Sequence, residues 1–461
     1  HTSLYLMKNE DDLAMRSSAT YTLTRFVDCF SAKKNQADAS PYLEIMDDII
    51  IPRIKTGVRE KNENIRRGYV KLINHTVQHA KYFHDFSDMK ILVPEREGTN
   101  FFDDITHLQM YKRQKAVRNL ALISGEFTSA SIAHYLLPII EHYAFWTEEK
   151  FRNLANDTVD SMEPLLSRLT WHQFRAIFVR YLKIMNSAMI KDDPEKLRDT
   201  VLMIVAASRA FNSWSIPDAK RPHDYPKEDI LCRFVIEQTL PQLKRCLNVR
   251  NADTMVKKIP VSEAMISLIM CCPKERIDAE LPGILTGVCQ ILRSRSEEIR
   301  DAVRKHLGRI AKSLGSKFLN FIFRELKGAL TRGPQIHILS FTIHYLLVIM
   351  ENEINHGDLV ESADLIVESI MNDIFGAASE EKAATGYSNK TKEIKHNKSY
   401  DTGELLAENI YLKNFLHLLK PIKFLLGEKL TLKAQTRLDE LLRRFAVGLM
   451  KNEESKTKDI L

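Results

Sequence analysis

The chain has 461 residues, of which 44% are hydrophobic, and it contains only 16 glycines and 15 prolines. This composition supplies enough apolar surface for a continuous core, and it has too few turn residues for a β-rich fold. The net charge of +7 is mild for this length, and solvated helix faces explain it without a nucleic acid. A basic groove for nucleic acid or for an acidic partner is the alternative.

The six cysteines form no C-x-x-C pair and most lie among apolar residues. We interpret them as reduced thiols of an intracellular protein, which excludes a disulfide framework and a cysteine zinc site. The longest apolar run, 341–350, is too short to span a membrane. The chain begins without an initiator Met and ends in charged residues, which indicates a fragment of a longer array.

The first part of the chain is predicted to be helical, with a pair over 3–30 and a further helix over 42–59. Pro52 should kink or split that helix, because proline removes a backbone donor and clashes with the preceding turn. His75 and His79 follow, four residues apart, and so share one helix face. No third ligand is evident nearby in the sequence, so we interpret them as surface histidines and predict no metal site.

The stretch 100–121 combines a cationic and an apolar face on one predicted helix. Lys112, Lys115 and Arg118 are three residues apart, and apolar residues occupy roughly the opposite arc. Together with Arg113, these residues are candidates for contact with RNA phosphates or with an acidic partner. An ordinary solvated face is the simpler interpretation of the same pattern.

A proline-containing linker is predicted over 214–227, and helices resume over 228–375. The clearest repeat lies at 294–349, where helix, tight turn and helix recur at a period of roughly 40 residues. Its apolar stripe has spacings of four, four, three and four, and consists of Ile299, Val303, Leu307, Ile310 and Leu314. Gly315 is expected to end that helix, and Arg304 to pair structurally with Glu298.

The stretch 376–400 is predicted to be a basic polar loop, with a second set of candidate RNA or partner contacts at Lys390, Lys392, Lys395, Lys398 and Tyr400. Helices return over 401–461, and the repeats before the proline linker occupy 1–213. The pattern as a whole predicts an all-α protein, an α-solenoid of HEAT-like helical pairs wound as a right-handed superhelix.

The sequence contains no pattern of a catalytic site. A phosphate-binding G-x-x-x-x-G-K-[ST], a G-x-G-x-x-G and a G-x-S-x-G are all absent, and no strands are evident to hold a nucleotide. The expected protein is therefore not an enzyme and uses no cofactor.

Five segments, in the same order along the chain, resemble one family. The words are NFFDDITHLQMYKRQKAVRNLA at 100–121, IPVSEAMISLI at 259–269, the long stretch 280–347, DIFGAASEEK at 373–382 and NKSYDTGELLA at 397–407. They resemble the down-regulated in metastasis (DRIM) family, which is also named U-three small nucleolar RNA-associated protein twenty. Members of this family are very large HEAT-repeat components of the small-subunit processome. Lys112 and Lys115 stand where that family tends to have arginine, and lysine cannot make the bidentate phosphate contact of arginine.

The resemblance implies a nucleolar scaffold in early ribosome biogenesis. It implies partners among pre-ribosomal RNA, the small nucleolar ribonucleoprotein and other processome proteins, with no membrane and no small-molecule substrate. Two alternatives stay open for a chain of HEAT-like pairs: an importin-type transport receptor, and the scaffold subunit of a phosphatase or kinase complex.

Overall fold

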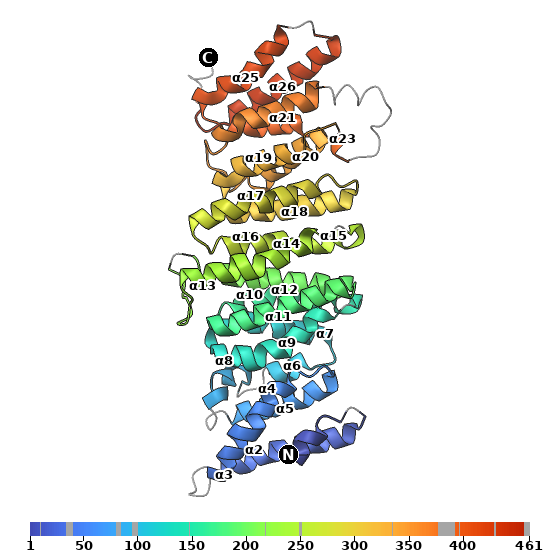
Figure 1. Ribbon diagram of the computed structural model, residues 1–461, viewed down its shortest axis with the longest axis vertical. Coiled ribbons are helices and arrows are strands. Elements are labelled where there is room, and N and C mark those ends of the chain that lie inside the picture. Colours follow the sequence, from blue (N-terminus) through green and yellow to red (C-terminus); the bar gives the residue numbers. More distant parts are fainter. Residues whose placement is uncertain are drawn as a thin grey trace. The chain divides into compact units, whose positions relative to one another are not determined.

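The computed structural model describes residues 1–9, 11–33, 40–79, 84–94, 100–146, 148–216, 218–248, 251–333, 335–376, 392–395, 397–427 and 430–455. Within these ranges every regular element is a helix, which confirms the predicted all-α class (Figure 1). The chain forms two compact units, His1–Phe234 and Val235–Leu461. None of the described helices has the length and apolar character needed to cross a membrane.

The first unit contains mainly α-helices, with several short 3-10 and π turns between them. Its elements are α1 (Thr2–Leu6), α2 (Leu13–Lys33), α3 (Ser40–Glu44), η1 (Ile45–Ile50), α4 (Ile51–Gly57), α5 (Glu63–Gln78), η3 (His84–Phe86), η4 (Asp88–Leu92), α6 (Phe101–Ile105), α7 (Met110–Leu122), η5 (Ser124–Glu126), α8 (Ser129–Ser131), η6 (Ile132–Leu136), α9 (Leu137–Glu141), η7 (His142–Phe145), η8 (Glu149–Phe151), α10 (Arg152–Leu166), α11 (Trp171–Ile190), α12 (Pro194–Ser213) and α13 (Glu228–Cys232).

The second unit begins within the π turn η9 and is likewise built from helices joined by short turns. Its elements are η9 (Arg233–Thr239), α14 (Leu240–Asn248), α15 (Ala252–Lys258), α16 (Val261–Ile269), α17 (Lys274–Ile291), α18 (Glu297–Leu314), η10 (Ser316–Phe318), α19 (Leu319–Ala329), α20 (Gln335–Ile349), η11 (Val360–Ser362), α21 (Ala363–Phe375), α23 (Lys392–Lys395), α24 (Ser399–Asn409), α25 (Leu412–Leu426) and α26 (Leu432–Lys451).

Helices in each unit pack against their neighbours in a repeating way. In the first unit α10 contacts both α7 and α12, and in the second α18 contacts both α16 and α20. Contact with the next-but-one helix as well as the next is what a stack of helical pairs produces. The expected helical-pair repeat is therefore present, and Figure 1 shows the rows of helices within each unit.

The repeat at 294–349 folds as its periodicity predicts. Ser296 caps α18, its Oγ accepting a hydrogen bond from the backbone N–H of Ile299 at 3.4 Å. All five residues of the predicted stripe are buried, and the most exposed of them, Leu314, is 8% exposed. Gly315 follows with φ 87, a left-handed conformation that favours glycine, and it ends the helix there.

Three prolines near the start of short helices share one local structure. A π turn directly precedes the short helices that hold Pro52, Pro138 and Pro241 near their first residues. A proline lacks the backbone donor and its ring collides with the carbonyl four residues earlier, and a wider π turn moves that carbonyl away. Pro52 therefore interrupts the regular α pattern without ending the run of helical residues from 40 to 57.

The proline segment 214–227 packs on the first unit. The Trp214 side chain is 1% exposed, and its indole N–H donates to the Ser167 carbonyl at 2.9 Å. The Asp224 carboxylate accepts from the backbone N–H groups of Trp171 at 2.8 Å and His172 at 3.1 Å, at the first turn of α11. The segment thus covers a helix start, and the boundary between the units lies after it.

Part of the expected polar loop at 376–400 is helical. Residues 392–395 form α23, and α24 begins at Ser399. The rest of that stretch, 377–391 and 396, lies outside the described residues.

Many charged side chains, most of them at least partly exposed, pair with the neighbouring repeat. The two partners lie 36 to 52 residues apart, close to the period read from the sequence, so each pair joins one helical pair to the next. These pairs are Lys8–Glu60, Arg113–Glu63, Arg118–Asp157, Arg152–Glu195, Arg180–Glu141, Lys244–Glu280, Arg309–Glu263, Lys327–Glu368, Arg444–Glu404 and Lys451–Glu404. Stacking therefore engages many of the cations that a nucleic acid would otherwise meet.

Candidate nucleic-acid interface

Helix α7 presents two lysines to solvent without an acidic partner. Lys115 is exposed and Lys112 is half-buried, and neither has an ion-pair partner among the described residues. They lie three residues apart and so share one face of the helix. Two unpaired ammonium groups on one face can attract a phosphate backbone, in a manner that weakens as the salt concentration rises.

Arg113 lies in the interior. Its side chain is 2% exposed, its Nε donates to the His107 carbonyl at 2.6 Å, and its Nη2 donates to Glu63 at 3.1 Å. The guanidinium also lies over the rings of Tyr143 and Trp146, at 5.5 and 5.3 Å from their centres. The structure therefore places Arg113 in the packing between helices.

The spacing of residues in the sequence already indicates that Arg113 is buried. Arg113 precedes Ala116, Val117 and Leu120 by three, four and seven residues, the spacing of the buried stripe of α7. The position therefore belongs to the apolar face, and the charge is tolerated there because hydrogen bonds and aromatic rings surround it.

Arg118 is exposed but already bound. Its guanidinium makes a two-pronged contact with Asp157 of α10, at 2.8 and 2.9 Å, and Gln114 donates to the same carboxylate at 3.0 Å. A phosphate would have to compete with Asp157 for this group. Of the four candidates on α7, Lys112 and Lys115 are the two that remain available.

The second set of candidates lies around α23 and the start of α24. Lys392 pairs with Asp301 at 3.0 Å and Lys398 pairs with Asp401 at 2.9 Å. Tyr400 is half-buried, and this burial raises the pKa of its hydroxyl. Lys390 lies outside the described residues, and of Lys395 only the backbone is described.

A buried carboxylate lies between two arginines of α18, and the sequence pattern does not indicate this arrangement. Glu393 of α23 is 3% exposed and lies between Arg300 and Arg304 of α18, which are 2% and 1% exposed. Arg300 donates two hydrogen bonds to the Glu393 carboxylate, at 2.7 and 2.8 Å, and Arg304 donates to the same carboxylate. Burial by itself would raise the pKa of Glu393, but these hydrogen bonds outweigh it and lower that pKa to about 2.

Arg304 is buried, and its partners differ from the expected one. It pairs with Asp301 at 2.6 Å, with Glu393, and with the Thr342 hydroxyl at 3.3 Å. Glu298 is exposed in the first turn of α18, where a carboxylate favours the positive end of the helix dipole. The six-residue spacing expected to join Glu298 to Arg304 places them on different sides of the helix.

One buried cluster contains the residue types of a hydrolytic triad. Asp373 of α21 accepts from Ser399 of α24 at 2.5 Å and is paired with His337 of α20. The serine donates to the aspartate rather than to the histidine, and all three residues are at most 3% exposed. The cluster therefore joins three helices and offers no nucleophile to solvent.

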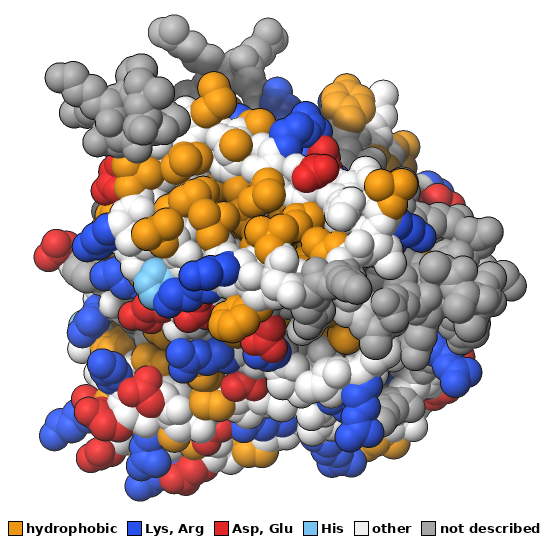
Figure 2. Space-filling view, turned by 90° about the horizontal axis from the view of Figure 1, so that it is seen from above, with side chains coloured by type: hydrophobic (Ala, Val, Ile, Leu, Met, Phe, Trp, Pro, Cys, Tyr) orange, Lys and Arg blue, Asp and Glu red, His pale blue; other side chains and the backbone are white. Residues whose placement is uncertain are grey.

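The end of the second unit that carries α25 and α26 has an apolar surface. Figure 2 looks onto it and shows hydrophobic side chains gathered there. Exposed apolar side chains on and beside these helices are Leu416, Phe424, Leu426, Leu432 and Met450, each at least 60% exposed. Contiguous apolar surface of this kind occurs where another polypeptide packs.

Comparison with known families gives two matches. Residues 249–461 match the U3 small nucleolar RNA-associated protein 20 domain, and residues 1–62 match the N-terminal domain of U3 small nucleolar RNA-associated protein 20. Among solved structures, the chain is similar to a Kap95p–RanGDP complex (TM-score 0.32, 12% identity, covering 100% of this chain and 59% of that one). It is also similar to the karyopherin Kap121p bound to the extreme C-terminus of the protein phosphatase Cdc14p (TM-score 0.34, 12% identity, 99% and 51%).

Two curated relatives match along the chain. The U3 small nucleolar RNA-associated protein 20 of Saccharomyces cerevisiae is 38% identical over 100% of this chain, and that of Schizosaccharomyces pombe is 29% identical over 99%. The chain spans 19% of the length of each relative. The family matches at both ends and the full-length similarity agree with the five segments noted in the sequence, and the chain belongs to the U3 small nucleolar RNA-associated protein 20 family.

Proposed function

We propose that this chain is a non-enzymatic scaffold segment of the small-subunit processome, which holds pre-ribosomal RNA and assembly factors during small-subunit ribosomal RNA processing in the nucleolus. The observation that carries the proposal is the 38% identity, over the whole chain, to a protein named for its association with the U3 small nucleolar RNA. Because the chain spans 19% of that relative, the partners of the whole relative are part of the proposal.

The RNA contact within the first unit is assigned to Lys112 and Lys115. Both ammonium groups are free of acidic partners among the described residues, whereas Arg118 is held by Asp157. Lysine acts as a point charge, so the expected contact is with phosphate and independent of base sequence. In the second unit, Lys392 and Lys398 are weaker candidates, since each must first leave an aspartate.

Stacked helical pairs suit a scaffold because they expose many helix faces while each pair is held by its neighbours. The ion pairs between repeats fix adjacent pairs to each other, and the apolar end at α25 and α26 offers a surface for protein contact. RNA phosphates can therefore bind the first unit while protein helices bind the second.

A depletion and rescue experiment tests this function. Cells that lack the endogenous protein are given the full-length protein, either unchanged or with Lys112→Glu and Lys115→Glu. We expect the unchanged protein to restore cleavage of the small-subunit precursor RNA, and the double variant to restore it less well and to bind pre-ribosomal RNA less tightly. Lys183→Glu with Lys196→Glu is the matched control, because both lysines are exposed and lack an ion-pair partner among the described residues of the same unit.

Normal maturation of the small subunit after depletion would contradict the scaffold function. Equal rescue by both double variants would contradict the assignment of Lys112 and Lys115 while leaving the function in place. Enrichment of nuclear pore proteins, instead of nucleolar proteins, with the purified protein would favour a transport receptor.

A further inference from the structure

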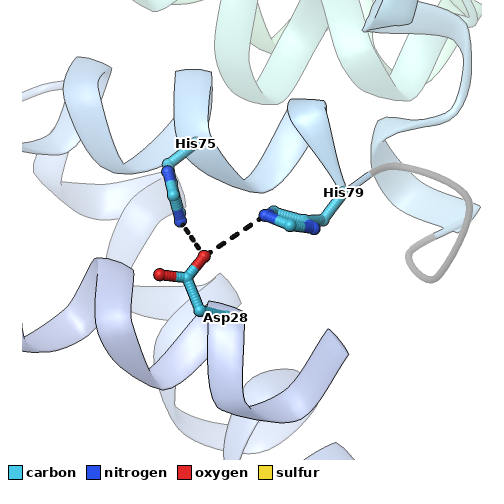
Figure 3. A group of neighbouring side chains, drawn as sticks. All are labelled: Asp28, His75 and His79. Atoms are coloured by element: carbon cyan, nitrogen blue, oxygen red, sulfur yellow. Dashed lines mark hydrogen bonds and ion pairs between the residues drawn. The ribbon is translucent and has the colours of Figure 1, made fainter. Parts of the chain in front are cut away.

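Two imidazoles and a carboxylate converge between α2 and α5 in the first unit (Figure 3). The Nε2 atom of His75 lies 2.6 Å from Oδ1 of Asp28, and the Nε2 atom of His79 lies 3.3 Å from the same oxygen. The two imidazole rings are 5.2 Å apart between centres. All three groups therefore point their ligand atoms at one small volume.

The local structure explains why they meet. His75 and His79 are one turn apart at the end of α5, so their side chains leave the helix on the same face. Helix α2 packs against α5 and carries Asp28 on the facing side. Arg25, one turn earlier on α2, binds the other carboxylate oxygen at 3.1 Å, which leaves Oδ1 directed at the histidines.

The separations are close to those of a transition-metal site. With metal–ligand bonds of about 2.0–2.1 Å, two ligand atoms of a tetrahedral ion lie about 3.3 Å apart. The His79–Asp28 separation of 3.3 Å already has this value, and the His75–Asp28 separation of 2.6 Å needs to widen by less than an ångström. The three ligand atoms all lie within 4.8 Å of one another.

The surroundings allow an ion to enter and water to complete its coordination. The side chains of His75, His79 and Asp28 are 27%, 30% and 29% exposed, so the cluster lies at the surface and is partly shielded from solvent. Two imidazoles with one carboxylate suit first-row transition ions, and imidazole ligands disfavour Mg²⁺ and Ca²⁺. A bound ion requires the Nε2 lone pair, so each imidazole would carry its proton on Nδ1.

We propose that Asp28, His75 and His79 form a binding site for a divalent transition ion, with Zn²⁺ as the first candidate. The ion would have three protein ligands and an open position for water, and it would join α2 to α5. Its expected effect is to fix α2 and α5, two helices of the first unit that pack against each other, because one ligand comes from α2 and two come from α5.

The competing explanation is that the histidines only hydrogen-bond Asp28. The chain contains a natural comparison for this, since His172 lies 2.7 Å from Asp224, and this pair is not part of a group of three possible metal ligands among the residues that the structure describes. Cys29, next to Asp28 and exposed, is a further group that could capture zinc on its own. Variants at these two positions separate the proposed site from an isolated His–Asp pair and from a thiol.

The test is calorimetric titration of the full chain with Zn²⁺, and with Co²⁺ while its visible absorption is recorded. We expect one Zn²⁺ per chain with Kd below about 100 μM, and a loss of at least about 10-fold in His79→Gln, His75→Gln and Asp28→Asn. His172→Gln and Cys29→Ser should bind as tightly as the unchanged chain. Zn²⁺ should also raise the melting temperature of the unchanged chain and not that of His79→Gln.

His79→Gln is the decisive variant because its side chain is partly exposed, so the fold should tolerate the change. Circular dichroism checks that it does. Absence of saturable binding in the unchanged chain would overturn the proposal. Binding of Zn²⁺ by His79→Gln and Asp28→Asn as tight as that of the unchanged chain would also overturn it. Loss of binding in Cys29→Ser alone would assign the ion to the thiol and also overturn it.

Discussion

Replacing Glu393 with glutamine removes the carboxylate that Arg300 and Arg304 share inside the second unit. The pKa of Glu393 falls from 4.5 to about 2 in the folded chain, which corresponds to about 3 kcal/mol of stability at neutral pH. Removing one partner of a buried ion pair costs about 3–5 kcal/mol in general. We expect the lower end here, because Arg304 keeps its pair with Asp301.

The pH dependence follows from the direction of that shift. The pKa is lower in the folded state, so the stabilisation is complete above the unfolded value of 4.5 and is lost as the pH falls towards 2. The difference between the unchanged chain and Glu393→Gln should therefore be constant from pH 7 to about 5 and then shrink.

Hydrogen exchange of the amides of α18, read by mass spectrometry, is the appropriate assay. It reports the local free energy of opening, whereas a chain with two compact units is not expected to unfold in one step. Glu368→Gln is the control, because Glu368 pairs with Lys327 at 2.5 Å while both side chains are about half exposed, and its loss should be below about 1 kcal/mol. Equal losses in the two variants, or a difference that grows below pH 4.5, would refute the reasoning.

Three further predictions concern packing, pH and capping. Gly448→Ala should destabilise the contact of α26 with α24, since the added Cβ would lie 2.1 Å from the Glu404 carbonyl oxygen. Gly287→Ala, with open space around the added Cβ, should stabilise α17 by about 0.5–1 kcal/mol. Hydrogen exchange of the amides of α26 and α17 measures both effects, and unchanged protection of α26 in Gly448→Ala would contradict the packing. Burial lowers the pKa of His142 to about 4, so the unfolded state binds the proton first and the first unit should lose stability as the pH falls from 6.5 to 4. Melting curves of His142→Gln should lack this part of the pH dependence. An unchanged pH profile of the melting temperature in this variant would contradict the role of His142. Asp224→Ala removes the acceptor for the first N–H groups of α11 and should cost about 1 kcal/mol of helix stability. The loss should appear as faster hydrogen exchange at the start of that helix. Unaltered protection there would show that the Asp224 cap contributes nothing.

Local features of the fold could be predicted from the sequence because they depend on neighbouring residues. The stripe from Ile299 to Leu314 is buried as its spacing predicts, and Gly315 ends the helix in the conformation that glycine allows. The composition pointed to helices, and every regular element in the described ranges is one.

The side-chain clusters could not be predicted because their members are distant in sequence. Glu393 lies 93 residues from Arg300, and Asp28 lies 47 residues from His75. Helix periodicity says which face a residue occupies, but the partner on the facing helix depends on the register of packing between helices. For this reason the sequence spacing pairs Arg304 with Glu298, and it gives no third group beside His75 and His79.

The cationic face of α7 shows that helix position alone does not predict which charges are available for binding. Counting charges by position selects Lys112, Lys115 and Arg118 equally, yet Arg118 is held by Asp157 and the two lysines have no acidic partner among the described residues. Availability of a charge depends on the neighbouring repeat and is not visible within one helix.

Crosslinking of the full-length protein to RNA in living cells, with identification of both the RNA and the crosslinked residue, tests the central proposal most directly. The account predicts recovery of small-subunit precursor RNA and U3 RNA, with crosslinks at or beside Lys112 and Lys115. Recovery of no ribosomal precursor RNA above the level of an uncrosslinked control would contradict it.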